Sequence, residues 1–402
     1  MSRALGRMEL PSLAHERRKN VRRHLARGLA DQFAACAAEH DRNGSFPFEN
    51  FTRLHEAGLL ALTVSKEHGG SGAGLGEAAA IVRIIAAAEA STALVLAMQY
   101  LQHAAAARTR RWPAALRECV ARDAVARGTL INAVRVEPEL GTPARGGLPK
   151  TIARRVAGGW RISGHKIYCT GAPALGWFSV WARTEDEAPQ IGFWLVPAEA
   201  AGIRIVETWD QLGLRASGSH DAIFDDVFVT DEHAADIRPI ADWAEPDPVA
   251  AAWNTLILAA LYLGIADAAR DWLLGHLHRR VPGNLGTPLA SLPRVEEAVG
   301  EIEALLQTGD SVLSAALAAV DNGAMPDIAA AGLVKFTVTN NAVHAVERAL
   351  SLVGNAGLAR VNPLERHYRD VLCGRIHTPQ DDSILIAAGR AALARHLQEN
   401  PS

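Results

Sequence analysis

The residues best suited to proton chemistry lie near the C-terminus, in the segment NPLERHYRDVLCGRIHTPQDD at 362–382. His377 is a candidate acid or base, because the ordinary pKa of histidine lies close to neutral pH. Asp381 and Asp382 follow Pro379 at a predicted helix start, where acidic side chains usually interact with free backbone N–H groups. The segment therefore offers one acid–base candidate and two carboxylates that a capping role explains.

Further polar candidates stand in less specific surroundings. His103 lies in the apolar run LAMQYLQHAAAA, where a hydrogen-bonded core histidine is the alternative to a catalytic one. Ser219 and His220, in ASGSHD, are candidates to contact a ligand or to pack a strand. The four cysteines lie far apart and form no C-x-x-C pair, so we expect neither a metal site nor a disulfide framework.

The composition is that of an ordinary globular protein. The 402 residues are 49% hydrophobic and 21% charged, with a net charge of −3, which gives no electrostatic bias toward nucleic acid or anionic membranes. We expect no membrane span and no secretion signal, and we expect a cytoplasmic protein. No G-x-G-x-x-G motif follows a predicted strand, which argues against a Rossmann site.

The patterning divides the chain into three segments and predicts an α+β protein. Residues 1–128 have helical spacing of apolar residues, including a long apolar stretch at 75–107. Residues 129–240 contain short β-branched and aromatic runs separated by Gly, Pro and Asp, which favours an antiparallel barrel or sandwich. Residues 241–402 return to helical spacing, and four long runs, the last at 383–397, predict a four-helix bundle.

Five motifs, in order along nearly the whole chain, resemble those of the acyl-CoA dehydrogenase superfamily. They are SKEHGGSGAGLGEAA, RVEPELG, WRISGHKIYCTGA, LGLRASGSHDAIFDDVFV and LVGNAGLARVNPLERHYRD. The resemblance implies a helical N-terminal domain, a central antiparallel β-barrel and a C-terminal four-helix bundle. It also implies a flavin, FAD or FMN, bound between barrel and bundle, and often a homotetramer.

The resemblance assigns flavin contacts to seven residues: Val134, Val136, Tyr168, Thr170, Arg280, Gly354 and Gly357. Thr170 would place its hydroxyl and N–H near the N5 and O4 edge, where fixed donors stabilise the reduced ring. Arg280 would meet the pyrophosphate. Gly354 and Gly357 would approach the dinucleotide of a neighbouring subunit. Alternatively, Thr170 is an ordinary strand threonine, and the two glycines form a helix C-cap.

The resemblance also shows where a dehydrogenase would hold its base. Such a base removes the α-proton of an acyl thioester and must lie in contact with it. Aligned on Arg369 and Asp370, the usual glutamate position holds Thr378, and the less common position on the first bundle helix holds Asn254. Neither side chain is an acid.

Three explanations remain open. His377 could serve as the base of an acyl-CoA dehydrogenase, or Asp381 or Asp382 could reach the site. Alternatively no α-proton is removed, and the protein resembles the branch of flavin monooxygenases that receive reduced flavin and use O2. We favour the last hypothesis, with a small-molecule substrate and with His377 and His103 in proton transfer. An inactive flavin-binding scaffold is a further alternative, against which the retention of Thr170 argues.

Substrate and partners follow from the same resemblance. Thr142 stands where the family uses a Ser or Thr to contact acyl-CoA, and Asn254, Ser219 and His220 are further substrate contacts. The loop around Thr142, GTPARGGLPKTIARR, departs from the family pattern, so an acyl-CoA substrate is in doubt. A monooxygenase would need a flavin reductase, and a dehydrogenase would need an electron-transferring flavoprotein.

Overall fold

The first third of the chain is helical, as its apolar spacing predicts. The protein is described from a computed structural model at residues 11–140, 147–243 and 247–400. Five helices precede the sheet: α1 (Pro11–Asn43), α2 (Phe48–Glu56), α3 (Leu75–Ala88), α4 (Ala90–Arg108) and α5 (Ala114–Arg127). Glu89 accepts hydrogen bonds from the N–H groups of Ser91 and Thr92 and so caps α4. This cap divides the long apolar stretch of the sequence into two helices.

The middle of the chain forms one eight-stranded sheet. Its strands are β1 (Leu130–Val134), β2 (Ile152–Val156), β3 (Gly159–Lys166), β4 (Leu175–Thr184), β5 (Gln190–Pro197), β6 (Ile203–Val206), β7 (Asp221–Thr230) and β8 (Ala234–Pro239). They are ordered β6-β7-β3-β2-β4-β5-β8, with β1 also paired to β4. The α+β class is confirmed, but the β1–β4 and β2–β4 pairings are parallel, so the sheet is mixed. The short runs predicted the strands but could not reveal that β1 and β2 reach β4 through long connections.

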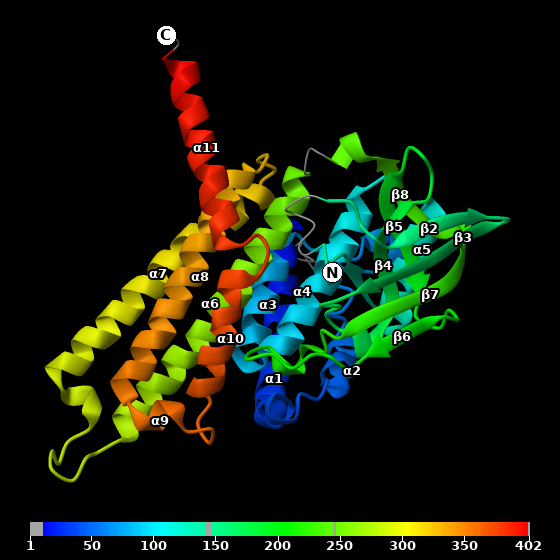
Figure 1. Cartoon of the computed structure of the whole chain (residues 1–402). Helices are drawn as coiled ribbons and strands as arrows, with labels where there is room; N and C mark the ends of the chain where they lie inside the picture. The colour runs from blue at the N-terminus through cyan, green and yellow to red at the C-terminus, as the bar shows by residue number, and fades with distance from the viewer. Residues whose placement is uncertain (1–10, 141–146, 244–246, 401–402) are drawn as a thin grey trace, which may run out of the picture.

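The last third forms the bundle of helices. Its elements are α6 (Pro248–Arg279), α7 (Pro293–Asp321), α8 (Ile328–Val353), α9 (Asn355–Leu358), α10 (Leu364–Ile376) and α11 (Asp381–Glu399). Figure 1 shows α6, α7, α8 and α10 side by side. The run at 383–397, the expected fourth helix of the bundle, lies in α11, and α11 projects away from the body. The polar sequence of α10 concealed its place, because His367 and Asp370 are buried in the interior.

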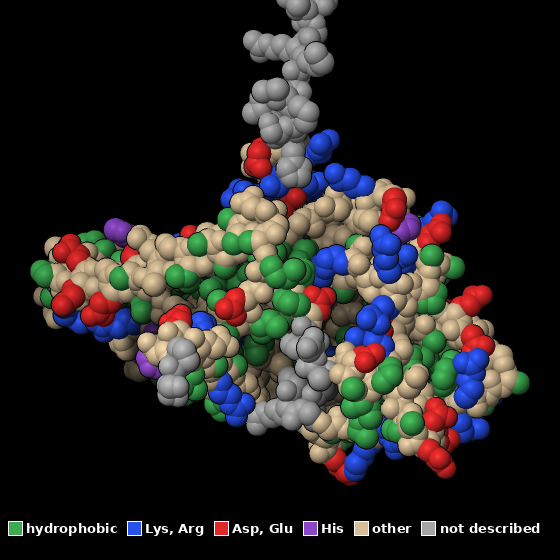
Figure 2. All heavy atoms as spheres, turned by 90° about the horizontal axis from the view of Figure 1, so that it is seen from above, with side chains coloured by type: hydrophobic (Ala, Val, Ile, Leu, Met, Phe, Trp, Pro, Cys, Tyr) green, Lys and Arg blue, Asp and Glu red, His purple; other side chains and the backbone are tan. Residues whose placement is uncertain are grey.

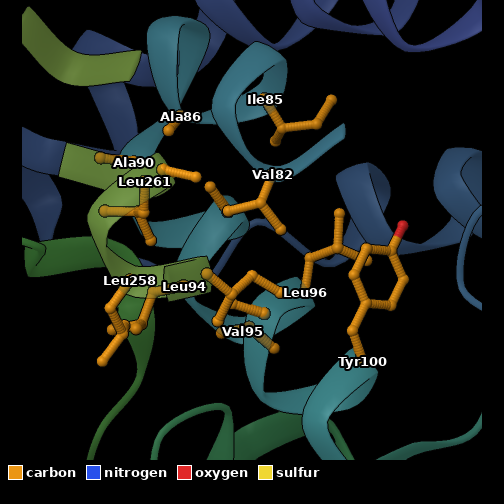
Figure 3. Packing of buried hydrophobic residues seen from close by; sticks show 14 of the residues in the cluster. Val82, Ile85, Ala86, Ala90, Leu94, Val95, Leu96, Tyr100, Leu258 and Leu261 are labelled. Atoms are coloured by element: carbon orange, nitrogen blue, oxygen red, sulfur yellow. The ribbon is translucent and has the colours of Figure 1, made fainter. Parts of the chain in front are cut away.

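The N-terminal helices pack directly on the bundle. In Figure 3, side chains of α3 and α4 meet Leu258 and Leu261 of α6 in a fully apolar contact. A leucine buried in this way contributes about 1.5–3 kcal/mol. A Cβ on Gly264 would lie 2.3 Å from the carbonyl oxygen of Arg83, so only glycine permits the close approach of α6 to α3. The side chain of Arg83 also forms an ion pair with Asp267 of α6 at 2.6 Å.

One continuous hydrophobic core contains residues from all three segments. Among the described residues, α6 alone is long and apolar enough to cross a membrane, although the sequence suggested no such segment. Most of its apolar stretch is buried inside the protein, as in the core helix of a globular fold. On the face shown in Figure 2, acidic and basic side chains are interspersed, in agreement with the small net charge.

Candidate functional site

The two positions that the resemblance gives to a base lie side by side. Asn254, in the first turns of α6, donates a hydrogen bond from Nδ2 to the carbonyl oxygen of Thr378 at 3.1 Å. Thr378 lies in the turn between α10 and α11. Both side chains are half-buried and neither ionises near neutral pH. Two distant parts of the sequence therefore meet at one point, and this point carries no acid.

The nearest carboxylates belong to the start of α11 and have structural contacts. Asp381 accepts a hydrogen bond from Asn340 Nδ2 at 2.9 Å and lies 3.7 Å from the Nζ of Lys335. Asp382 accepts a hydrogen bond from the N–H of Ser383 at 2.8 Å. Both carboxylates lie in the first turn of α11, where the helix dipole favours negative charge, and neither contact is with Asn254.

His377 lies next to Thr378 and is held by a tyrosine. Its Nδ1 lies 2.6 Å from the Oη of Tyr262 on α6. Burial, with the nearby Lys335 ammonium, lowers the pKa of His377 to about 4, and burial raises the pKa of Tyr262 well above its ordinary value. Both groups are therefore neutral at pH 7, and the imidazole carries a single proton there.

His103 is a buried histidine of α4 with a partner of its own. Its Nε2 lies 3.0 Å from Gln99 Nε2, which also donates to the carbonyl oxygen of Thr129. Gln99 Oε1 in turn accepts from the N–H of Ile131 at 2.8 Å. Burial lowers the pKa of His103 to about 4, so Nε2 accepts the amide hydrogen and the ring is neutral. Nothing in the described structure joins His103 to His377, so its role in proton transfer remains a prediction.

A second group of candidates gathers at one end of the sheet. The hydroxyl groups of Thr170, Ser219 and Ser217 form a chain, with Oγ1–Oγ and Oγ–Oγ distances of 3.0 and 2.8 Å. Asn132 of β1 donates from Nδ2 to the carbonyl oxygen of Thr170 at 3.0 Å. The N–H of Thr170 donates to the carbonyl oxygen of Tyr168 at 2.9 Å. Thr170 and Ser219 are therefore far apart in the sequence but direct neighbours in the structure.

The residues at this end of the sheet fit a flavin ring. The side chain of Tyr168 is 56% exposed and meets Trp209 edge to face at 6.2 Å. An exposed aromatic surface beside linked hydroxyl groups suits a planar ring with hydrogen-bonding edges. Tyr168 and Thr170 would hold such a ring. Val134 is buried in the core on β1, and the carbonyl oxygen of Val136 accepts from the N–H of Ile167.

The remaining predicted contacts are dispersed. Arg280 is exposed at the end of α6, and Gly354 ends α8 with a positive φ of 60°. Gly357 is buried in α9, and a Cβ there would lie 2.9 Å from Val353 Cγ2. The Nδ1 of His220 accepts hydrogen bonds from the N–H groups of residues 208 and 209, so this ring fixes a loop. Thr142 lies outside the described residues.

A separate hollow of about 260 Å³ lies between α1 and the chain that leads into α10. It is lined by Ala34, Ala38, Asp41 and Arg42 and by residues 360–363, 365 and 366. Neither His377 nor Thr170 lines it, so we do not include it in the site. The described part of the chain also contains no cluster of His, Cys, Asp or Glu side chains suited to a metal ion.

Three site residues escaped prediction from the sequence. Tyr262 and Lys335 lie within apolar helical runs, and Ser217 lies two residues before Ser219 in the same motif. Lys335 gave a detectable signal, because it is one of only five lysines and interrupts an otherwise apolar helix face. No such signal marks Tyr262 in the sequence, since tyrosine is common in buried helices.

Comparison with known proteins assigns the family. Models of the N-terminal, middle and C-terminal domains of acyl-CoA dehydrogenase match residues 15–109, 135–227 and 251–390. The chain is 33% identical over 359 residues to the putative acyl-CoA dehydrogenase YdbM of Bacillus subtilis, with 89% of this chain and 92% of that protein covered. It is 30% identical over 392 residues to L-evernosamine nitrososynthase from a Micromonospora species, with coverages of 91% and 89%.

A solved structure also resembles this chain over most of its length. KijD3, in complex with FMN and dTDP-3-amino-2,3,6-trideoxy-4-keto-3-methyl-D-glucose, superposes with a TM-score of 0.82 at 28% identity over 94% of each chain. The motifs, the order of the elements and these matches lead to one assignment. The chain belongs to the acyl-CoA dehydrogenase family.

Proposed function

We propose that this flavin-dependent oxidoreductase receives reduced flavin, FMN or FAD, and uses O2 to oxidise a small molecule. The observation that carries the proposal is the contact between Asn254 and Thr378. A dehydrogenase of this family needs a base at one of these two positions, and here both are neutral and bonded to each other. Bound reduced flavin supplies the electrons that activate O2.

The part of this chain in that reaction is to bind the ring and to handle protons. Tyr168 and Thr170 would contact the flavin, and Ser219 bonds to the Thr170 hydroxyl. His377 is neutral at pH 7 and can donate or accept a proton beside the site. His103 is the second candidate for the same task. Asn254, Ser219 and His220 are candidate substrate contacts.

The relatives support a small-molecule substrate. L-evernosamine nitrososynthase and KijD3, whose complex holds FMN and a sugar nucleotide, are similar to this chain over most of its length. A flavin reductase is the partner that such a reaction requires.

The alternative is an acyl-CoA dehydrogenase that uses His377 as its base. The similarity to YdbM, named a putative acyl-CoA dehydrogenase, favours it. It would require an electron-transferring flavoprotein as partner. A pKa of about 4 makes this imidazole a weak base for an α-proton, which argues against the alternative.

We also propose a cytoplasmic homotetramer whose subunits contain domains at 1–128, 129–240 and 241–402. The projecting α11 supports self-association, because Leu385, Ile386, Leu393 and Leu397 are all exposed on it. Apolar side chains gathered on one helix are typical of an interface. Gly354 and Gly357 would then face the flavin of another subunit.

The test is an anaerobic titration of the oxidised flavoprotein with acyl-CoA thioesters of several chain lengths, followed by visible absorbance. We expect the flavin band to persist with every thioester. In parallel, ultrafiltration should show tighter binding of reduced than of oxidised FMN or FAD. Bleaching of the band by any acyl-CoA would establish dehydrogenation and refute the proposal.

A further inference from the structure

Lys335 is fully buried in the first half of α8, and its donors act on the end of α10 and on the turn that follows it. Its Nζ donates to the carbonyl oxygens of Gly374 at 2.7 Å, His377 at 3.0 Å and Pro379 at 2.9 Å. The three N–H bonds of the ammonium are therefore all used. Gly374 lies in the last turn of α10, and His377 and Pro379 lie in the turn that joins α10 to α11.

Such a placement is unusual for a lysine. A buried ammonium loses its hydration and is normally compensated by a carboxylate in direct contact. The closest carboxylate oxygen, on Asp381, lies 3.7 Å away, too far for a hydrogen bond. Three backbone carbonyl groups therefore contact the ammonium directly, and Asp381 adds an electrostatic attraction across 3.7 Å.

Other contacts fix the same turn. Thr378 O accepts from Asn254, so the carbonyl groups of residues 377, 378 and 379 each accept from a bundle side chain. At Gly374 a Cβ would lie 3.1 Å from the ring of Tyr262, so the end of α10 packs directly on α6. The backbone at His377 is held from α6 and α8 although it has no regular secondary structure.

We propose that Lys335 is a positioning residue of the flavin site, which clamps the turn carrying His377 and Thr378 and places a positive charge beside it. The clamp rests on the proposed function only in giving His377 a proton to handle. With the turn fixed, the Tyr262 hydroxyl and Nδ1 of His377 stay hydrogen-bonded at 2.6 Å, and the direction of this bond decides the tautomer. Nε2 is then held at a fixed point, as a donor where Tyr262 donates to Nδ1 and as an acceptor where Nδ1 donates to Tyr262.

The groups that face His377 decide the electrostatic part. Lys335 from α8 and Tyr262 from α6 contact His377, and Asp381 from α11 lies 3.7 Å from the Lys335 ammonium. Of these, Lys335 disfavours a second positive charge on the imidazole. Removal of the ammonium should therefore loosen the turn and also make His377 easier to protonate.

The test compares Lys335→Met with Lys166→Met in the full-length flavoprotein. Lys166 is the other fully buried lysine, but it pairs with Glu137 at 2.6 Å in the sheet region. In Lys335→Met we expect roughly tenfold faster exchange of the His377 amide, which donates to Cys373 O, and of its neighbours. We also expect the His377 pKa, followed by NMR, to rise above its value of about 4, with burial still holding it below the ordinary value. Lys166→Met should lower the melting temperature without either change.

Two outcomes would overturn the clamp: unchanged exchange and titration of His377 in Lys335→Met, or equal changes in both variants. Should Lys335→Met fail to fold, Lys335→Gln retains hydrogen-bond donors without the charge. That variant should raise the His377 pKa while it preserves part of the amide protection, and an unchanged pKa would again contradict the proposal. Neither readout uses O2 or a substrate. A reaction with acyl-CoA would therefore refute the proposed function and leave the clamp standing.

Discussion

The proposed site has two halves that are built from different chemistry. The sheet half comprises Tyr168, Thr170, Ser217 and Ser219, and its members are neutral groups that bond to one another. The bundle half comprises Asn254, Tyr262, Lys335, His377 and Thr378, which come from α6, α8 and the turn before α11. The bundle half contains the ionisable groups whose pKa values burial displaces.

This difference separates two tasks. A chain of hydroxyl groups has the same hydrogen-bonding capacity across the neutral pH range, so the sheet half can hold a ring without responding to pH. The bundle half holds an imidazole and an ammonium where solvent is excluded, so its charges depend on neighbouring groups. We infer that ring binding belongs to the sheet half and proton handling to the bundle half. Perturbing each half should therefore give a different signature.

The largest effect on stability is expected when the pH is lowered. In the unfolded chain a histidine binds its proton near pH 6.5, whereas in the folded protein His377 does so only near pH 4. Between these values the unfolded state binds more protons, so the free energy of unfolding decreases as the pH falls. The gap corresponds to roughly 3 kcal/mol for this residue.

Replacement of His377 by Asn removes that contribution. Denaturant unfolding at several pH values between 7 and 4 should show that His377→Asn loses about 3 kcal/mol less than the wild type. A residual dependence will remain, because burial also lowers the pKa of His103 to about 4 and that of His367 to about 3. Identical pH profiles for the variant and the wild type would show that His377 is not held neutral.

A smaller effect on stability is expected when a larger side chain is placed in the bundle half. In Gly374→Ala the new methyl group would lie 3.1 Å from the Tyr262 ring and 3.3 Å from Thr339 Cβ, so α10 must shift. We expect a loss of about 1–3 kcal/mol in unfolding free energy and a change in the His377 titration.

Gly389→Ala provides the matched control for that substitution. Gly389 lies inside α11, and the methyl group of an alanine there would have no atom within 4 Å, so the substitution should stabilise the helix by about 0.5–1 kcal/mol. If Gly374→Ala stabilised the protein as much as Gly389→Ala, helix propensity would explain both substitutions and the contact with Tyr262 would be refuted.

The two halves also differ in how far the sequence predicts them. Thr170 and Ser219 each stand in a short local motif beside a strand, so each could be identified from the sequence, although their contact and the role of Ser217 could not. The fold was predictable for the same reason, since periodicity identifies individual helices and strands. The place of α10 was missed because its buried His367 and Asp370 do not look apolar in the sequence.

The bundle half could be predicted only in part. Alignment identified Asn254 and Thr378 as the two candidate base positions, and their contact in space follows from the packing of α6 against the turn. The roles of Tyr262 and Lys335 depend on contacts over 115 and 42 residues of sequence. No spacing rule covers such distances, because they are set by how helices cross rather than by local pattern.

The smallest expected effect tests the sheet half. Ser219→Ala breaks the hydrogen bonds from Ser219 to Thr170 and Ser217, which should cost about 0.5–1.5 kcal/mol and leave the pH dependence of stability as in the wild type. Oxidised flavin should bind several-fold more weakly, because the Thr170 hydroxyl loses its support. Ser351→Ala, which removes an exposed hydroxyl on α8, should change neither quantity. If Ser219→Ala altered the acid response and left flavin affinity intact, the division of tasks between the halves would be wrong, because ring binding would no longer depend on the hydroxyl chain.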